Sequence, residues 1–135
     1  MASRREARRQ AIDVLFQADL TGADGRRILA EWHAAGRTVD PFAEELVEGV
    51  TAVRDEVDAL LAEHSEHWPL DRMAGVDRTI LRVAAYELLH RPDVPPAAAI
   101  DEAVRAAKEL STEDSGAFVN GILGRIARDA DSAPP

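Results

Sequence analysis

The sequence predicts an all-α protein, a compact bundle of about six or seven helices. In most segments of its 135 residues apolar side chains recur every three or four positions, the spacing of one helix face. No segment alternates apolar and polar residues as a half-buried strand does. Serine, aspartate, proline and glycine stand where helix ends need them. We expect one domain over residues 1–130 and a disordered tail over 131–135.

The first two helices are delimited by a capping box and by glycines. Ser3 followed by Glu6 fits the capping box, so a helix is expected from Ser3 to about Leu20. A second, shorter helix is closed by Gly36. Its apolar stripe consists of Ile28, Leu29, Trp32 and Ala35.

The middle of the chain predicts one long helix and then a central one. Asp40 and Pro41 supply a cap and a first-turn proline, and apolar residues then recur at helical spacing to about Glu63. After a turn near 70–73, the stretch 76–89 is apolar or small over most of its circumference. This stretch is therefore expected to be the central helix.

Prolines and a threonine delimit the last two helices. Pro92, Pro95 and Pro96 end the central helix, because proline lacks an amide hydrogen and disfavours the helical conformation in the residue before it. Another helix follows, and Thr112 can cap a final one. Their apolar stripes are Ile100, Ala103, Val104 and Ala107, and then Phe118, Ile122 and Ile126.

Composition and motifs argue against an enzyme, a disulfide scaffold or a membrane protein. The chain has no cysteine, no glycine-rich nucleotide-binding motif, no nucleophile elbow and no apolar run near the ~20 residues of a membrane span. We expect a cytoplasmic protein without cofactor or metal. His64 and His67 stand three apart beside Glu63 and Glu66, but no further ligand set accompanies them, so a metal site there is disfavoured.

Four arginines crowd the start of the first predicted helix in a chain whose net charge is -9. They are Arg4, Arg5, Arg8 and Arg9. Each of the first two costs about 0.3–1 kcal/mol against the helix dipole relative to an acid, so stability alone would not select them. Arginine holds phosphate in bidentate fashion, which makes this cluster a candidate anion site. The alternative is a solvated helix end, because the chain has fifteen arginines and one lysine.

The stretch STEDSGAFVNG is the second unusual feature. Hydroxyls and carboxylates crowd the start of the last predicted helix, where they suit capping, although they could also bind the edges of nucleobases. Phe118 is expected to be a core residue more often than a base-stacking platform. Asn120 and Gly121 lie within the helix, where local propensity does not favour them.

Three motifs in order carry a resemblance over nearly the whole chain. R-R-x-A-R near the start, D-V-P followed by A-I-D-E-A, and E-D-S-x-x-F-V-N-G resemble the NusB family of transcription antitermination factors. The resemblance implies two packed helical subdomains and no catalysis. It also implies binding of boxA single-stranded RNA from ribosomal RNA operons, together with the ribosomal protein NusE, in an RNA polymerase antitermination complex.

The resemblance also assigns residues. The RNA-binding residues of the family correspond to Arg4, Arg5, Arg8, Arg9, Asp114, Ser115 and Phe118. The surface that faces NusE corresponds to Phe16 and Asp77. Gly116 and Ala117 stand where some relatives carry polar or basic side chains.

Two alternatives stay open from the sequence. NusB-like domains precede certain ribosomal RNA methyltransferases, but this chain lacks their catalytic cysteine and cofactor domain. Some NusB-like proteins form structural homodimers, and the sequence does not decide whether this one does.

Overall fold

The computed structural model describes residues 3–65 and 68–132, with residues 131 and 132 described by their backbone alone. Within these residues it has seven α-helices, one short 3-10 helix and no strand. The all-α prediction is confirmed. The helices are α1 (Arg4–Thr21), α2 (Gly25–Ala34), α3 (Pro41–Ala52), α4 (Arg54–His64), η1 (Leu70–Arg72), α5 (Gly75–His90), α6 (Pro96–Leu110) and α7 (Glu113–Ser132).

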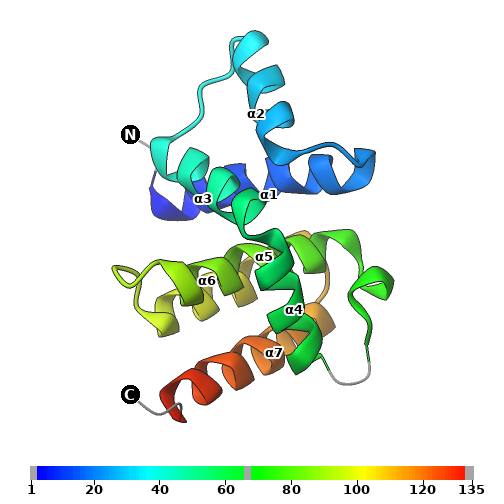
Figure 1. Ribbon diagram of the computed structural model, residues 1–135, viewed down its shortest axis with the longest axis vertical. Helices are drawn as coiled ribbons and strands as arrows, with labels where there is room; N and C mark the ends of the chain where they lie inside the picture. Colours follow the sequence, from blue (N-terminus) through cyan, green and yellow to red (C-terminus); the bar gives the residue numbers. More distant parts are fainter. Residues whose placement is uncertain (1–2, 66–67, 133–135) are drawn as a thin grey trace.

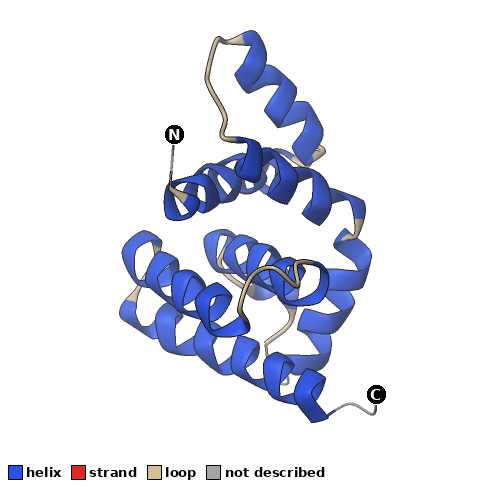
Figure 2. Ribbon diagram, turned by 90° about the vertical axis from the view of Figure 1, so that its left-hand side faces the viewer, coloured by secondary structure: helices blue, strands red, loops and turns tan. Residues whose placement is uncertain are grey.

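The helices form two packed groups. Figure 1 shows α1, α2 and α3 at one end of the molecule and α4 to α7 at the other. The two groups meet where α1 and α3 pack against the central helix α5. Figure 2 shows α6 and α7 lying side by side in the second group. The expected pair of helical subdomains is therefore present.

Helix α1 begins where the capping box predicts. The hydroxyl of Ser3 accepts a hydrogen bond from the Glu6 amide at 3.1 Å. The helix ends at Gly22, whose φ of 72° lies in the left-handed region that glycine adopts without strain. Ala7, Ala11 and other small or branched residues of its buried face let α1 approach α3 and α5 closely.

The prediction of one long helix from Asp40 to Glu63 is wrong, because this segment forms two helices, α3 and α4. Val53, with φ -119° and ψ 25°, is not helical and separates α3 from α4. The two pieces serve different groups, since α3 packs on α1 and α2 whereas α4 packs on α5 and α7. A single non-helical residue barely shifts the apolar spacing, so the pattern could not reveal the break.

The C-terminal half follows the sequence closely. α5 buries residues around most of its circumference, as expected of the central helix. The Ser115 amide donates to the Thr112 hydroxyl at 3.0 Å, which confirms the predicted cap of α7. α7 continues to Ser132, so two residues of the expected tail are helical, and 133–135 lie outside the described residues. In the described part of the chain, no helix is long and apolar enough to cross a membrane.

Candidate nucleic-acid interface

The N-terminal arginines form a row on α1, and each meets a carboxylate from α6, from the end of α5 or from the loop after it. Arg4 lies 3.4 Å from Asp93, Arg5 lies 2.9 Å from Glu102, Arg8 lies 2.9 Å from Glu87, and Arg9 lies 2.7 Å from Glu109. These pairs offset the unfavourable helix dipole at the start of α1. The row is therefore part of the contact between the two groups of helices as well as a candidate anion site.

Arg8 is the buried member of this row. Its guanidinium donates two hydrogen bonds of 2.9 Å to the two carboxylate oxygens of Glu87. The Glu87 side chain is 1% exposed and that of Arg8 is 12% exposed. The hydrogen bonds that Arg8 donates to Glu87 raise the pKa of Arg8 although burial opposes this. Arg8 is thus committed to the interior and offers little surface to an external phosphate.

The outer arginines keep an accessible guanidinium. Arg4 and Arg5 are each 52% exposed, and Arg9 is 26% exposed. The hydrogen bond from Arg5 lowers the pKa of Glu102, so this carboxylate stays charged. Exposed ion pairs of this kind contribute little stability, and a phosphate can replace the carboxylate. The structure thus separates the row into one structural arginine and three that remain reachable.

Ser115 and Asp77 form a polar contact between α7 and α5. The Ser115 hydroxyl donates to Asp77 Oδ2 at 2.9 Å and lies 3.0 Å from the hydroxyls of Ser111 and Thr112. Both residues are buried. Among the described residues, Asp77 Oδ1 is a buried oxygen without a hydrogen-bond partner. These two residues, expected at the RNA and partner surfaces, hold the start of α7 in place and also line a surface pocket.

Asp114 and Phe118 lie at the rim of a surface pocket beside this contact. The pocket has a volume of about 320 Å³. Its lining is largely apolar and comes from the segments on either side of η1, from α5, and from the start of α7 with the residue before it: Trp68, Met73, Ala74, Asp77, Thr112, Asp114, Ser115 and Phe118. Asp114 is exposed and Phe118 is half-buried. A flat aromatic guest with hydrogen-bond donors matches these walls and carboxylates.

Phe16 lies in a separate groove. This groove, of about 510 Å³, is lined by Arg9, Ile12, Asp13, Phe16, Val76 and Leu110. Leu110 is 46% exposed, so the groove has an accessible apolar floor. Asp77 does not line it. The structure therefore brings Phe16 together with Val76 and Leu110, and places Asp77 on the other side of the α5 start.

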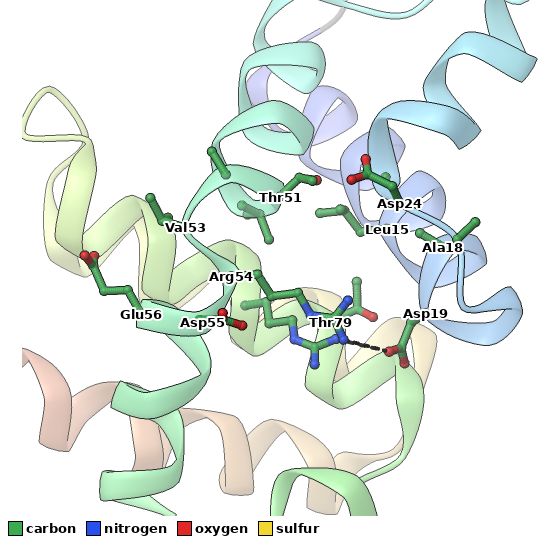
Figure 3. A pocket seen from close by; sticks show the side chains of 15 residues that line it. Leu15, Ala18, Asp19, Asp24, Thr51, Val53, Arg54, Asp55, Glu56 and Thr79 are labelled. Carbon is green, nitrogen blue, oxygen red and sulfur yellow. Dashed lines mark hydrogen bonds and ion pairs between the residues drawn. The ribbon is translucent and has the colours of Figure 1, made fainter.

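A third pocket, of about 470 Å³, lies between the two groups of helices. Figure 3 shows Asp19 and Arg54 among its lining residues, and Arg54 lies 3.8 Å from the Asp19 carboxylate. Arg78 and Arg82 donate to Asp19 at 2.6 and 3.1 Å, and Arg82 also donates to Asp58. Burial alone would raise the pKa of Asp19, but the hydrogen bonds from both arginines lower it. The charge of Asp19 is thus matched by arginines of α5, and these hydrogen bonds tie α1 to α5.

His64 joins α4 to α7 instead of joining a metal cluster. Its Nδ1 lies 2.9 Å from the Leu60 carbonyl and its Nε2 lies 2.6 Å from Asp129. Arg125 donates to the carbonyl of His64 at 2.8 Å. Within the described residues, no group of three potential ligands is positioned to hold a metal ion. His67 lies outside those residues.

The sequence-based interpretation missed the acidic partners and part of the pocket walls. Nothing in the sequence distinguishes Glu87 and Glu102 from other surface acids, although they form ion pairs with Arg8 and Arg5. Trp68 is 52% exposed although it is large and aromatic, and Leu110 is similarly exposed. Both residues line surface pockets, but exposure cannot be assigned from one sequence.

Comparisons with known proteins agree with this geometry. A protein of Saccharopolyspora erythraea named transcription antitermination protein NusB is 52% identical, with 97% of this chain and 90% of that protein covered. The structure of T. maritima NusB superposes with a TM-score of 0.82 at 38% identity, covering 94% of this chain and 92% of that one. A chain in a crystal structure of the antitermination factors NusB and NusE with double-stranded RNA gives a TM-score of 0.82 at 27% identity, covering 93% and 96%.

Residues 5–128 match the family described as the NusB family. That range includes α1 from its second residue, all of α6 and most of α7. It therefore includes Arg5, Arg8 and Arg9 of the arginine row and the pocket beside Asp114. The chain belongs to the NusB family.

Proposed function

We propose that this protein is a non-catalytic transcription antitermination factor of the cytoplasm that binds boxA RNA of ribosomal RNA operons together with the ribosomal protein NusE. One observation supports this most. Accessible guanidiniums of Arg4, Arg5 and Arg9 lie on α1 in an otherwise acidic chain. Arg5 and Arg9 pair with carboxylates of α6, which leads into the start of α7 with its aromatic-walled pocket. Phosphate contacts position a single strand and base contacts select it, and this face offers groups for both.

The seven expected RNA-binding residues take different roles in this proposal. Arg4, Arg5 and Arg9 exchange their carboxylates for phosphates, because they are exposed. Asp114 and Phe118 contact a base. Arg8 and Ser115 do not contact the RNA. Through hydrogen bonds to Glu87 and Asp77 they hold α1 and α7, which carry the contacting residues, in position.

The partner NusE is proposed to bind the groove at Phe16. Its floor of Phe16, Val76 and Leu110 is apolar, and Asp13 adds an exposed carboxylate at its edge. Such a surface suits a basic protein that inserts an apolar side chain. Asp77 supports this groove indirectly, because it fixes the start of α5. Joined to NusE, the factor would enter the RNA polymerase antitermination complex.

A homodimer through the same groove is the rival use of this surface. Light scattering at micromolar concentration distinguishes the two, because a dimer that needs Phe16 becomes monomeric in Phe16→Asp. If the protein is monomeric both with and without the substitution, the homodimer is refuted and NusE remains the proposed occupant of the groove.

The function is tested by fluorescence anisotropy with a single-stranded boxA-like RNA of about a dozen nucleotides and a scrambled control. Titrations with and without NusE should show tighter binding of the boxA-like RNA, and a further gain when NusE is present. Equal binding of both RNAs in the presence of NusE would refute the proposal. Asp114→Ala and Phe118→Ala should reduce the discrimination between the two RNAs more than the salt dependence.

A further inference from the structure

We propose that the groove between α6 and α7 extends the RNA path, and that Arg105 and Lys108 are its phosphate-binding residues. This inference rests on the proposed function. The groove has a volume of about 640 Å³ and is lined by Asp101, Val104, Arg105, Lys108, Glu109 and Asn120. It lies on the face of α6 next to the one that holds the arginine row.

The charge balance distinguishes these two cations from the row on α1. Arg4, Arg5, Arg8 and Arg9 each have a carboxylate within 3.4 Å. Arg105 and Lys108 are exposed, and in the part of the chain that the structure describes neither forms an ion pair. An incoming phosphate therefore displaces no ion pair from them, although Glu102 attracts Arg105 at longer range.

Helix geometry places both cations beside the arginine row. At about 100° per residue, Glu102 and Glu109 lie on one side of α6 and face Arg5 and Arg9 of α1. Lys108 points about 100° away from Glu109, and Arg105 lies between the two directions. A strand that leaves Arg5 therefore meets Arg105 first and Lys108 next.

The missing side chain at Gly116 lets Lys108 reach α7. A Cβ atom at this position would lie 2.7 Å from Lys108 Cγ and 2.9 Å from Cε, so the aliphatic part of Lys108 occupies that space. The lysine crosses the first turn of α7, which carries Asp114 and leads to Phe118. Lys108 thus supplies positive charge to a turn that has none of its own.

The remaining groups of the groove are compatible with a nucleic acid. Asn120 is exposed on α7 and provides both a donor and an acceptor, which accounts for an amide residue within a helix. Two carboxylates also line the groove. Glu109 is held by Arg9 at 2.7 Å, so its charge is offset, and Asp101 stands one turn before Arg105.

The test is a salt series of anisotropy titrations with the boxA-like RNA and the full chain in the presence of NusE. The double variant Arg105→Ala/Lys108→Ala is compared with wild type and with Arg26→Ala/Arg27→Ala, which removes the same charge from α2 at the far end of the molecule (Figure 1). Loss of two phosphate contacts should lower the slope of log affinity against log salt by about 1.4 and weaken binding about tenfold at low salt. The control pair should match wild type within about twofold. Thermal unfolding checks that both double variants fold.

Three outcomes are distinguishable. Selective loss in the Arg105/Lys108 variant supports the groove. If both double variants bind RNA as tightly as wild type does, the proposed RNA contact at the groove is refuted, but the proposed function stands. If wild type does not prefer the boxA-like RNA at all, the proposed function fails and the groove fails with it.

Discussion

Arginine side chains on one helix can differ sharply in role although the sequence presents them alike. Arg8 is 12% exposed and fixed by two hydrogen bonds to a carboxylate that is itself buried. Arg4 is 52% exposed and lies 3.4 Å from Asp93, whose pKa is already lowered to about 2, mainly by Arg91. Arg8 is therefore important for stability. Arg4 also lies 4.4 Å over the Phe42 ring, but as an exposed side chain it contributes much less.

Arg8→Ala should destabilise the protein by about 3–5 kcal/mol, because it leaves Glu87 buried without a partner. Urea unfolding followed by circular dichroism measures the change. Arg4→Ala is the control and should have little effect on stability. Replacing both Arg8 and Glu87 by Met should recover most of the loss, and a double variant as unstable as Arg8→Ala would contradict this assignment.

Glu102→Gln should tighten RNA binding about two- to fivefold at low salt. The substitution removes the carboxylate that competes with phosphate for Arg5 and keeps the shape of the side chain. Anisotropy titrations measure the gain. Glu31→Gln releases Arg27 on α2 in the same way and should leave RNA binding unchanged. Equal or weaker binding by Glu102→Gln would show that Arg5 does not reach the RNA.

The arginine row could be predicted from the sequence, but its partners could not. The arginines are neighbours in the chain and stand against the helix dipole, which is a local signal. Glu87 and Glu109 lie 79 and 100 residues away from the arginines they bind, and only the packing of α1 on α5 and α6 brings them together. The burial of Asp77 and Ser115 is likewise a result of tertiary packing.

At the scale of helices, the helix ends were easier to predict than the break at Val53 between α3 and α4. Ser3 and Thr112 cap their helices through hydrogen bonds within three residues, and this chemistry is visible in the sequence. The break at Val53 depends on contacts that the local pattern lacks. α3 approaches α5 so closely that Gly49 lies directly against Tyr86.

Gly49→Ala should destabilise the protein by about 1–3 kcal/mol, because the new Cβ would lie 2.2 Å from the Tyr86 ring. Gly121→Ala is the matched control in another helix. Its Cβ would meet only Arg125 Nη1 at 3.6 Å, so it should raise stability by up to about 1 kcal/mol through helix propensity. Thermal and urea unfolding compare the two. Similar changes for both glycines would contradict the close contact between α3 and α5.

His64 makes the contact between α4 and α7 sensitive to pH. Both of its ring nitrogens face acceptors, a carbonyl and a carboxylate, so both hydrogen bonds form only when the ring is protonated. Burial would lower the pKa of His64, but the hydrogen bonds to Leu60 and Asp129 outweigh burial and raise it. Asp129, Glu63 and Arg125 are the charged groups around it.

Asp129→Asn should cost about 1 kcal/mol or less near pH 6, and the cost should shrink as pH rises. The sign follows from the raised pKa: the stabilisation is complete below the unfolded value of about 6.5 and is lost as pH rises through the folded value. Urea unfolding of wild type and variant from pH 6 to pH 9 measures the difference. A difference that stays constant or grows with pH would contradict the protonated contact.

At the scale of the whole molecule, charge is segregated. The chain carries -9 overall, yet the positive side chains of the α1 start and of α6 lie together, and the apolar groove at Phe16 borders them through Arg9. The negative remainder repels RNA, so binding is confined to this face and benefits from a basic partner at the adjacent groove. The resemblance of sequence motifs predicted this function, whereas the different roles of the individual binding residues could be assigned only from the structure.

The most direct test is photo-crosslinking of a boxA-like RNA that carries 4-thiouridine, with NusE present, followed by mapping of the crosslinked peptides. We predict crosslinks to the first turns of α1, to the exposed face of α6 around Arg105 and to the start of α7 at Phe118. Crosslinks confined to α2 and α3, with none on α1, α6 or α7, would contradict it.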